Sequence, residues 1–210
     1  MTAPAQSRPH EAIAALLLAL AAVTTAWCSF QAAHWHGQQA RSAAVSNALR
    51  IKVSTALGQA DAQQQVDIAT FIQWVNAYSA HDATLEDFYR SRFRPEFKPA
   101  FAAWLATKPL TTAGAPPTPF AMKQYTLQAR QDAARLDARS AAAATRAAQC
   151  IQRAESYVLS VVLLSLTLFF AATGSRFGSM KVRTVMIGMA GLLFTGTVIW
   201  IALLPKGIAV

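Results

Sequence analysis

Two uncharged apolar runs, joined by a short basic segment, constrain the fold of this chain most strongly. Residues 157–174 and 184–204 contain no Asp, Glu, Lys or Arg. Each run approaches the length of about 20 residues that crosses a bilayer as a helix. The segment between them, residues 175–183, carries three cations and no acid. Because short cytoplasmic loops of membrane proteins are rich in Lys and Arg, the pattern predicts a membrane hairpin with its turn in the cytoplasm.

A third apolar run covers residues 12–30 and has two interpretations, a cleaved signal peptide or a retained anchor. The segment before it is weakly basic and includes Glu11. Trp27 stands directly before Cys28, where a bulky residue spoils a lipoprotein cleavage site. We therefore expect an uncleaved first span, and cleavage stays open as the alternative.

Three spans place the N-terminus and the basic turn on the same, cytoplasmic side, because long domains cross a membrane regardless of their charge. The excess of Lys and Arg on the predicted cytoplasmic side is weakened by three arginines that precede the second span on the outer side, Arg139, Arg146 and Arg153. The predicted order is a cytoplasmic N-terminus 1–11, a first span 12–30, an outer domain 31–156, a second span 157–174, a cytoplasmic turn 175–183, a third span 184–204 and an outer tail 205–210.

Apolar residues recur every three or four positions at both ends of the outer domain, which predicts two long amphipathic helices. The series in the first helix, over residues 38–80, consists of Val45, Leu49, Val53, Ala56, Ala60, Ile68, Ile72, Val75 and Tyr78. The series in the return helix, over residues 123–156, is smaller and consists of Ala129, Ala133, Leu136, Ser140, Ala143, Ala147, Ile151 and Ala154. We expect each helix to continue into its neighbouring span, and the two series to pack against each other.

The two arms differ in length. At about 1.5 Å per residue, residues 31–79 would extend about 74 Å and residues 123–156 about 51 Å. Either the first arm bends near residues 58–65, or its end projects into a separate head. We expect a stalk of residues 31–65 and 123–156 that carries a helical cap, residues 66–122. The predicted fold class is therefore an all-α membrane protein with three transmembrane helices and an extracytoplasmic helical stalk or bundle. Its modest core favours oligomerisation.

Prolines and a capping pattern divide the cap. Thr84 is the predicted N-cap of a short helix. This helix should end near Arg94, because Pro95 disfavours helical geometry in the residue before it. Pro99 opens a second short helix, and the four prolines within residues 108–121 predict a loop.

Several short motifs lie along nearly the whole chain. They include Gln31-Ala32-Ala33-x-Trp35, Phe71-x-x-Trp74, Phe88-Tyr89-Arg90-x-Arg92-Phe93-Arg94-Pro95-Glu96-Phe97-x-Pro99-Ala100-Phe101-x-Ala103-Trp104-Leu105, Pro119-Phe120 and Tyr157-Val158-Leu159. On these motifs, of which the Arg-Phe-Arg-Pro-Glu-Phe stretch is the most specific, the chain resembles a group of bacterial inner-membrane proteins. The group shares the layout of one span, an outer helical domain and two further spans. No activity is assigned to that group, so the resemblance implies a location in the inner membrane and adds no function.

A cluster of charged and aromatic residues in the cap is the most informative candidate site. Its members are Arg90, Arg92, Arg94, Glu96, Lys98, Phe97, Phe101 and Trp104. Arginine offers bidentate geometry to an anion, and aromatic rings offer a rigid apolar surface. The cluster could therefore bind an anion or an acidic partner. The alternative is a cap whose aromatic residues form its core and whose charges pair locally, and this alternative is the one we expect.

Small and weakly polar residues mark the third span as a second candidate site, for contact between membrane helices. These residues are Gly188, Gly191, Thr195 and Gly196. Small residues let helices approach closely in a membrane, and a pore lining is the alternative interpretation. Apart from Cys28 and Tyr157, no span contains an ionisable residue. A proton relay or an ion-coupled transporter is therefore not expected.

No catalytic, cofactor or metal motif stands out. The net charge of +9 could suggest nucleic acid, but the cations are spread along helices or flank membrane segments. Cys28 lies within a span whereas Cys150 lies outside one, so a disulfide is not expected. His34 and His36 are two positions apart and face different sides of a helix, whereas a zinc pair on one helix needs four-residue spacing.

We therefore expect a non-enzymatic integral membrane protein with no cofactor. Its outer helical domain should mediate protein interaction or oligomeric assembly, and an accessory subunit of an envelope or membrane complex is one such role. Its expected partners are membrane lipid and either a protein partner or further copies of itself, without nucleic acid. The alternatives are a membrane-anchored ligand-binding or sensory module and an oligomeric channel.

Overall fold

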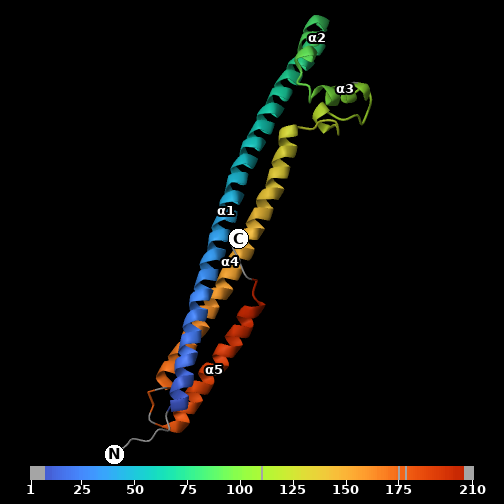
Figure 1. The fold of residues 1–210 in the computed structure, drawn as a ribbon. Coiled ribbons are helices and arrows are strands. Elements are labelled where there is room, and N and C mark those ends of the chain that lie inside the picture. Colours follow the sequence, from blue (N-terminus) through green and yellow to red (C-terminus); the bar gives the residue numbers. More distant parts are fainter. Residues whose placement is uncertain (1–7, 110, 175, 178, 206–210) are drawn as a thin grey trace, which may run out of the picture. The chain divides into compact units, whose positions relative to one another are not determined.

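The computed structural model describes residues 8–109, 111–174, 176–177 and 179–205 of the 210-residue chain. The predicted N-terminal segment, basic turn and tail thus lie partly outside the described residues. Over these residues the chain is all-α and contains no strand, which confirms the predicted fold class at this level. In chain order its elements are α1 (Arg8–Ser79), α2 (Ala83–Arg92), α3 (Lys98–Ala106), the 3₁₀ turn η1 (Pro119–Ala121), α4 (Gln128–Gly174) and α5 (Met180–Leu203) (Figure 1).

Three helices, α1, α4 and α5, are long and apolar enough to cross a membrane, which suggests a multi-pass membrane protein. The predicted first span and the predicted helix over residues 38–80 are parts of the single helix α1. This helix continues through residues 58–65, so its first arm is not interrupted there. The second span and the return helix are likewise joined in α4. Apolar and polar stretches share one helix because neither Pro nor a run of Gly breaks either sequence.

The chain divides into two compact units, which are described separately here. Unit 1 consists of Met1–Ala44 and Ala143–Val210, and unit 2 of Val45–Ala142. All three apolar runs of the sequence belong to unit 1. Unit 2 contains the residues of the predicted cap.

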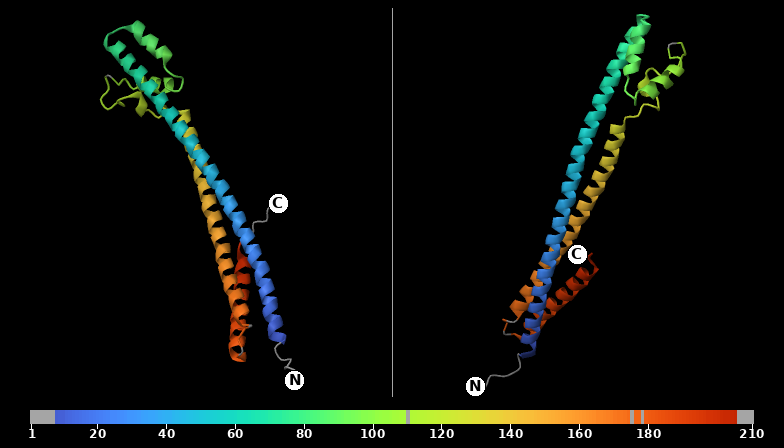
Figure 2. Two further views of the ribbon diagram at one scale, coloured as in Figure 1. Left: turned by 90° about the vertical axis from the view of Figure 1, so that its left-hand side faces the viewer. Right: turned by 45° about the horizontal axis from the view of Figure 1, so that its top comes forward.

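In unit 1, parts of α1 and α4 pack with α5 (Figure 2). Buried residues of α4 are spaced by seven positions, at Cys150, Tyr157, Leu164 and Ala171. This spacing is typical of helices whose side chains interlock along a narrow seam. Both cysteines are buried free thiols. The core cluster contains Ala21, Cys28, Ala32, Tyr157, Leu164 and Ile201.

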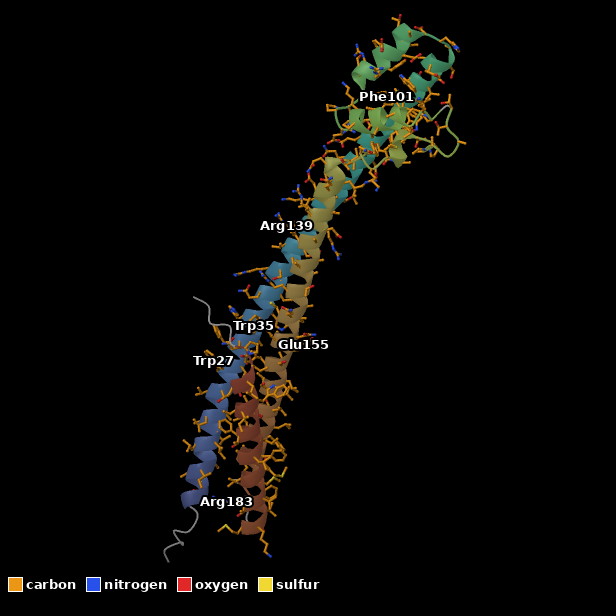
Figure 3. All side chains as sticks on the ribbon, turned by 90° about the vertical axis from the view of Figure 1, so that its right-hand side faces the viewer. Trp27, Trp35, Phe101, Arg139, Glu155 and Arg183 are labelled. Carbon is orange, nitrogen blue, oxygen red and sulfur yellow. The ribbon has the colours of Figure 1, made fainter. Side chains whose placement is uncertain are left out.

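Two contacts fix the ends of the helices in unit 1. Gly174 ends α4 against α5, where an added Cβ would lie 2.9 Å from the Cβ of Met186. A side chain would therefore separate the two helices at this point. Arg183 Nη2 lies 3.6 Å from Glu11 Oε1, which links the beginnings of α5 and α1 (Figure 3 labels Arg183).

In unit 2, α1 and α4 approach closely through small residues. Ser46 Oγ donates to the Ser140 carbonyl oxygen at 3.1 Å, and Ser140 Oγ donates to the Ser46 carbonyl oxygen at 3.2 Å. Ala60, Ala129 and Ala133 are buried along the same two helices. In the return helix the structure therefore buries much of the predicted small-residue series, in unit 2 at Ala129, Ala133 and Ser140 and in unit 1 at Ala147 and Ala154.

The buried face of α1 matches the predicted one only in part. Ala60 is buried and Leu49, Val53 and Ala56 are half-buried, but the other positions of the predicted series are exposed. Val45 is exposed and its neighbour Ser46 is buried. Further along, Ile68, Ile72, Val75 and Tyr78 are exposed, and the buried residues are Asp67, Phe71, Trp74 and Ala77. The physical reason is that Phe71 and Trp74 carry larger apolar surfaces than Ile or Val, and the aromatic residues of the cap pack on their side.

Element boundaries in the cap also differ. The N-cap of α2 is Asp82 rather than Thr84, because the Asp82 carboxylate accepts a hydrogen bond from the Leu85 backbone N–H at 3.0 Å. Aspartate is among the strongest N-cap residues. The helix ends at Arg92, earlier than predicted, and Phe93 is already extended. Pro99 lies in the first turn of α3 as expected. The return helix begins at Gln128 rather than near residue 123.

Candidate functional site

The predicted site lies in unit 2, around a cluster of aromatic side chains. Phe71 and Trp74 come from α1, and Phe101 and Trp104 come from α3. The ring centroids of Trp74 and Phe101 lie 4.8 Å apart at 78°, and those of Phe71 and Trp104 lie 5.4 Å apart at 85°. Such edge-to-face pairs are the arrangement that ring quadrupoles favour. Phe101, labelled in Figure 3, is almost fully buried. The buried cluster is completed by Phe93 and Phe97.

A hydrogen bond ties the long loop to this aromatic core. Trp104 Nε1 donates to the Pro116 carbonyl oxygen at 2.8 Å. Phe120, from η1, stacks on Phe97 with a centroid distance of 5.2 Å. The proline-rich segment is therefore held before η1, at Pro116, and within η1, at Phe120.

A buried carboxylate connects three separate parts of unit 2. The Asp67 side chain, on α1, is 0% exposed. Its Oδ2 accepts from Arg94 Nη1 at 2.9 Å and from the Tyr125 hydroxyl at 3.1 Å. Its Oδ1 is buried and has no hydrogen-bond partner among the described residues. Arg94 Nη2 also pairs with Glu96 Oε2. Asp67 thus joins α1 to the turn before α3 and to the segment before α4.

The charges of this network do not balance when both acids are ionised. One guanidinium, of Arg94, faces the two carboxylates of Asp67 and Glu96. Burial raises the pKa of the Asp67 carboxyl above its ordinary value, and this effect outweighs the lowering by Arg94 and Tyr125. Burial, followed by the nearby Asp67 charge, also raises the pKa of the Tyr125 hydroxyl. The phenol therefore remains protonated and can donate to Asp67.

We expect the stability of unit 2 to decrease as the pH rises through the pKa of Asp67. This pKa is raised above the value of about 3.9 in the unfolded chain. Between the two values the folded state binds the proton more tightly, so stability is highest below the unfolded value and falls as the proton leaves. Asp67→Asn removes this titration. Chemical unfolding of both proteins in mild detergent measures their free energies of unfolding from about pH 4 to about pH 8. The free energy of the wild type, relative to that of Asp67→Asn, should decrease as the pH rises. If the free energy of unfolding of the wild type, relative to that of Asp67→Asn, increased with pH, this expectation would be contradicted.

The structure separates the predicted site residues into three groups. Phe97, Phe101 and Trp104 are buried in the aromatic core. Arg94 and Glu96 pair with each other, and Arg94 also holds Asp67. Arg90, Arg92 and Lys98 are exposed. Of the predicted charged residues, this last group is the one whose side chains are exposed and unoccupied by the Asp67 network.

The exposed cations flank an open groove between α2 and α3. Its volume is about 520 Å³, and its lining residues are Asp87, Arg90, Ser91, Phe93, Lys98, Phe101 and Ala102. Lys98 Nζ donates to the Ser91 carbonyl oxygen at 3.0 Å, which holds it beside the groove. The Arg92 guanidinium instead lies over the Phe88 ring, 4.3 Å from its centroid. The groove therefore offers two cations, one acid and an apolar floor.

The second predicted site is not used for contact within unit 1. Gly188, Thr195 and Gly196 of α5 are exposed, and Gly191 is half-buried. A Cβ added at any of these glycines would meet nothing within 4 Å. The buried residues of α5 are instead Ile187, Ala190, Thr197 and Ile201. The small residues of α5 remain a predicted contact for a helix from another chain.

Sequence reasoning missed Asp67 and Tyr125. One signal was present, since Asp67 lies seven positions after Ala60 and before Trp74, on the face that the structure buries. An acid in an apolar helical stripe indicates a buried partner. The identity of that partner, Arg94, was not visible from spacing. Among the described residues, no group of three or more His, Cys, Asp or Glu side chains is placed to hold a metal.

Comparisons of this chain with protein-family models, with curated proteins and with solved structures return no match. The resemblance to a group of bacterial inner-membrane proteins therefore stays a prediction, and a functional proposal has to rest on geometry.

Proposed function

We propose that this chain is a non-enzymatic, multi-pass protein of the bacterial inner membrane whose unit 2 assembles with another protein chain. The three long apolar helices support the membrane location. The cations of residues 175–183 favour a cytoplasmic turn, and with it a cytoplasmic N-terminus and an outer unit 2. The sequence resemblance supports the inner membrane as the location.

The observation that carries the assembly role is an exposed apolar surface in unit 2. Ile68, Ile72, Val75 and Tyr78, here called the α1 stripe, are all exposed, with Ile72 at 50%. Their spacing of three and four residues places them along one side of the helix. Unit 2 contains none of the three apolar runs, so lipid does not account for this exposure. Contiguous exposed apolar patches of this kind mark interaction sites.

Helix α2 also favours contact with another protein chain. It has no buried residue in this chain, and its apolar residues Leu85 and Phe88 are both exposed. A ten-residue helix is marginal by itself in water. Contact with another chain would bury Leu85 and Phe88 and stabilise the helix.

A photo-reactive side chain introduced at position 72 tests the proposal in intact cells. We expect an adduct of defined mass with a second protein chain, and no adduct from the same group at the adjacent exposed residue Gln73. Adjacent helical residues point about 100° apart, so Gln73 is a matched control. Val75→Lys should abolish the adduct formed at position 72. Equal labelling from both positions, or no adduct from either, would contradict the assembly role.

The open groove between α2 and α3 favours a second candidate function, a ligand-binding module for an anion. Arg90 and Lys98 supply positive charge, and Phe93 and Phe101 supply an apolar floor. An anionic compound that raises the melting temperature of the wild type but not of Arg90→Ala would favour this function over assembly.

A further inference from the structure

A second groove lies in unit 1, and residues of the end of α4 and the beginning of α5 line it. Its volume is about 320 Å³. Except for Lys181, all its lining side chains are apolar: Phe170, Val182, Val185, Met186 and Met189. Methionine side chains are flexible and adapt to irregular apolar ligands. The groove therefore has the character of a site for a hydrocarbon chain, with one positive charge in its wall.

The groove is open to the surroundings of the helices. Val185 and Met189 are exposed, and so is Val182. These residues belong to α5, one of the helices long and apolar enough to cross a membrane. In a bilayer, an open apolar groove on such a helix faces acyl chains or another protein helix.

Charge decides between these two occupants. Lys181 and Arg176 are exposed and form no ion pair among the described residues, whereas Arg183 lies beside Glu11. Residues 157–204 contain no acid. A second copy of this face would therefore bring Lys181 no carboxylate from residues 157–204, and Glu11 of α1 already lies beside Arg183. An acidic lipid headgroup supplies both the missing negative charge and the acyl chain.

We propose that this groove binds one acyl chain of an anionic phospholipid, whose headgroup phosphate pairs with Lys181. Lysine buries its alkyl stem along apolar surface and keeps its ammonium group at the membrane interface. This arrangement lets the headgroup meet Lys181 while the acyl chain contacts Val185, Met186 and Met189. The site is independent of the partner surface on unit 2, so either can fail without the other.

Native mass spectrometry of the full-length protein in mild detergent tests this site with two probes, phosphatidylglycerol and phosphatidylcholine. We expect tighter retention of phosphatidylglycerol. Lys181→Gln should weaken that retention about fivefold and weaken retention of phosphatidylcholine less, because choline offsets the charge of its phosphate. Lys123→Gln, at an exposed cation of unit 2, is the matched control and should change neither.

A second variant tests the groove itself. Val185→Trp fills the groove and should reduce retention of both lipids, whereas Leu192→Trp, at an exposed position of α5 that does not line the groove, should not. Far-ultraviolet circular dichroism of each variant checks that the helices remain folded. Equal retention of the two lipids by the wild type, or an unchanged preference in Lys181→Gln, would overturn the proposal. A dimer that Val185→Trp dissociates would also overturn it, because a second copy would then occupy the groove.

Discussion

Arg94→Met is expected to destabilise unit 2 by about 3–5 kcal/mol at neutral pH. The substitution keeps most of the side-chain volume but removes the cation that faces Asp67, whose side chain is 0% exposed. A buried carboxylate without its ion-pair partner is costly in the folded state. The loss should become smaller in acid, where Asp67 binds a proton. Chemical unfolding in mild detergent, followed by hydrogen exchange of the α3 amides, measures the free energy at each pH.

Two further variants separate charge from packing in this prediction. Arg92→Met removes an exposed guanidinium that lies over the Phe88 ring, and it should cost no more than about 1 kcal/mol. The double variant Asp67→Asn with Arg94→Met removes the buried carboxylate together with its half-buried cationic partner, and it should recover much of the loss. If Arg94→Met and Arg92→Met have the same effect, the Asp67–Arg94 pair does not hold the cap together.

Trp104→Ala is expected to cost about 3–5 kcal/mol, the range for truncating a buried tryptophan. Trp104 is almost fully buried, its ring contacts Phe71 edge to face, and its Nε1 holds the Pro116 carbonyl oxygen. The substitution therefore leaves a cavity and also releases the proline-rich loop. Hydrogen exchange of the full-length protein should show loss of protection in α3.

The matched control for Trp104 is Phe88→Ala, because Phe88 is an exposed aromatic residue of the same unit. It should change the free energy of unfolding by less than about 1 kcal/mol, and it should weaken contact with another chain if α2 takes part in assembly. Undiminished protection of α3 in Trp104→Ala would show that the aromatic cluster is not the core of the cap.

Together these variants assign different tasks to neighbouring residues. Asp67, Arg94 and the buried rings stabilise unit 2, so their substitution should affect folding first. The α1 stripe and α2 lie outside that core, so their substitution should affect assembly with little change in stability. Measuring stability and cross-linking on the same variants therefore distinguishes a structural role from a role in partner binding.

Part of the candidate site could be predicted from the sequence. Aromatic spacing in the segment from Phe93 to Trp104 indicated a core, and the structure buries those rings. The separation of the cations into Arg94, which is paired, and Arg90, which is exposed, could not be predicted. It depends on Asp67, which is 27 residues from Arg94 in the chain. No local spacing rule connects residues so far apart.

The sequence by itself determined the three long apolar helices, because charge-free runs of bilayer length have few alternatives to a helix in a membrane. It also determined the continuity of α1 and α4, in which no proline interrupts the helical pattern. Only the tertiary structure decided which side of α1 is buried beyond residue 66. Two apolar stripes run along that part of the helix, one through Ile72 and one through Phe71 and Trp74, and either satisfies the helical period. The cap packs against the second stripe, because its aromatic rings and the Asp67–Arg94 pair meet there, and this leaves Ile72 exposed.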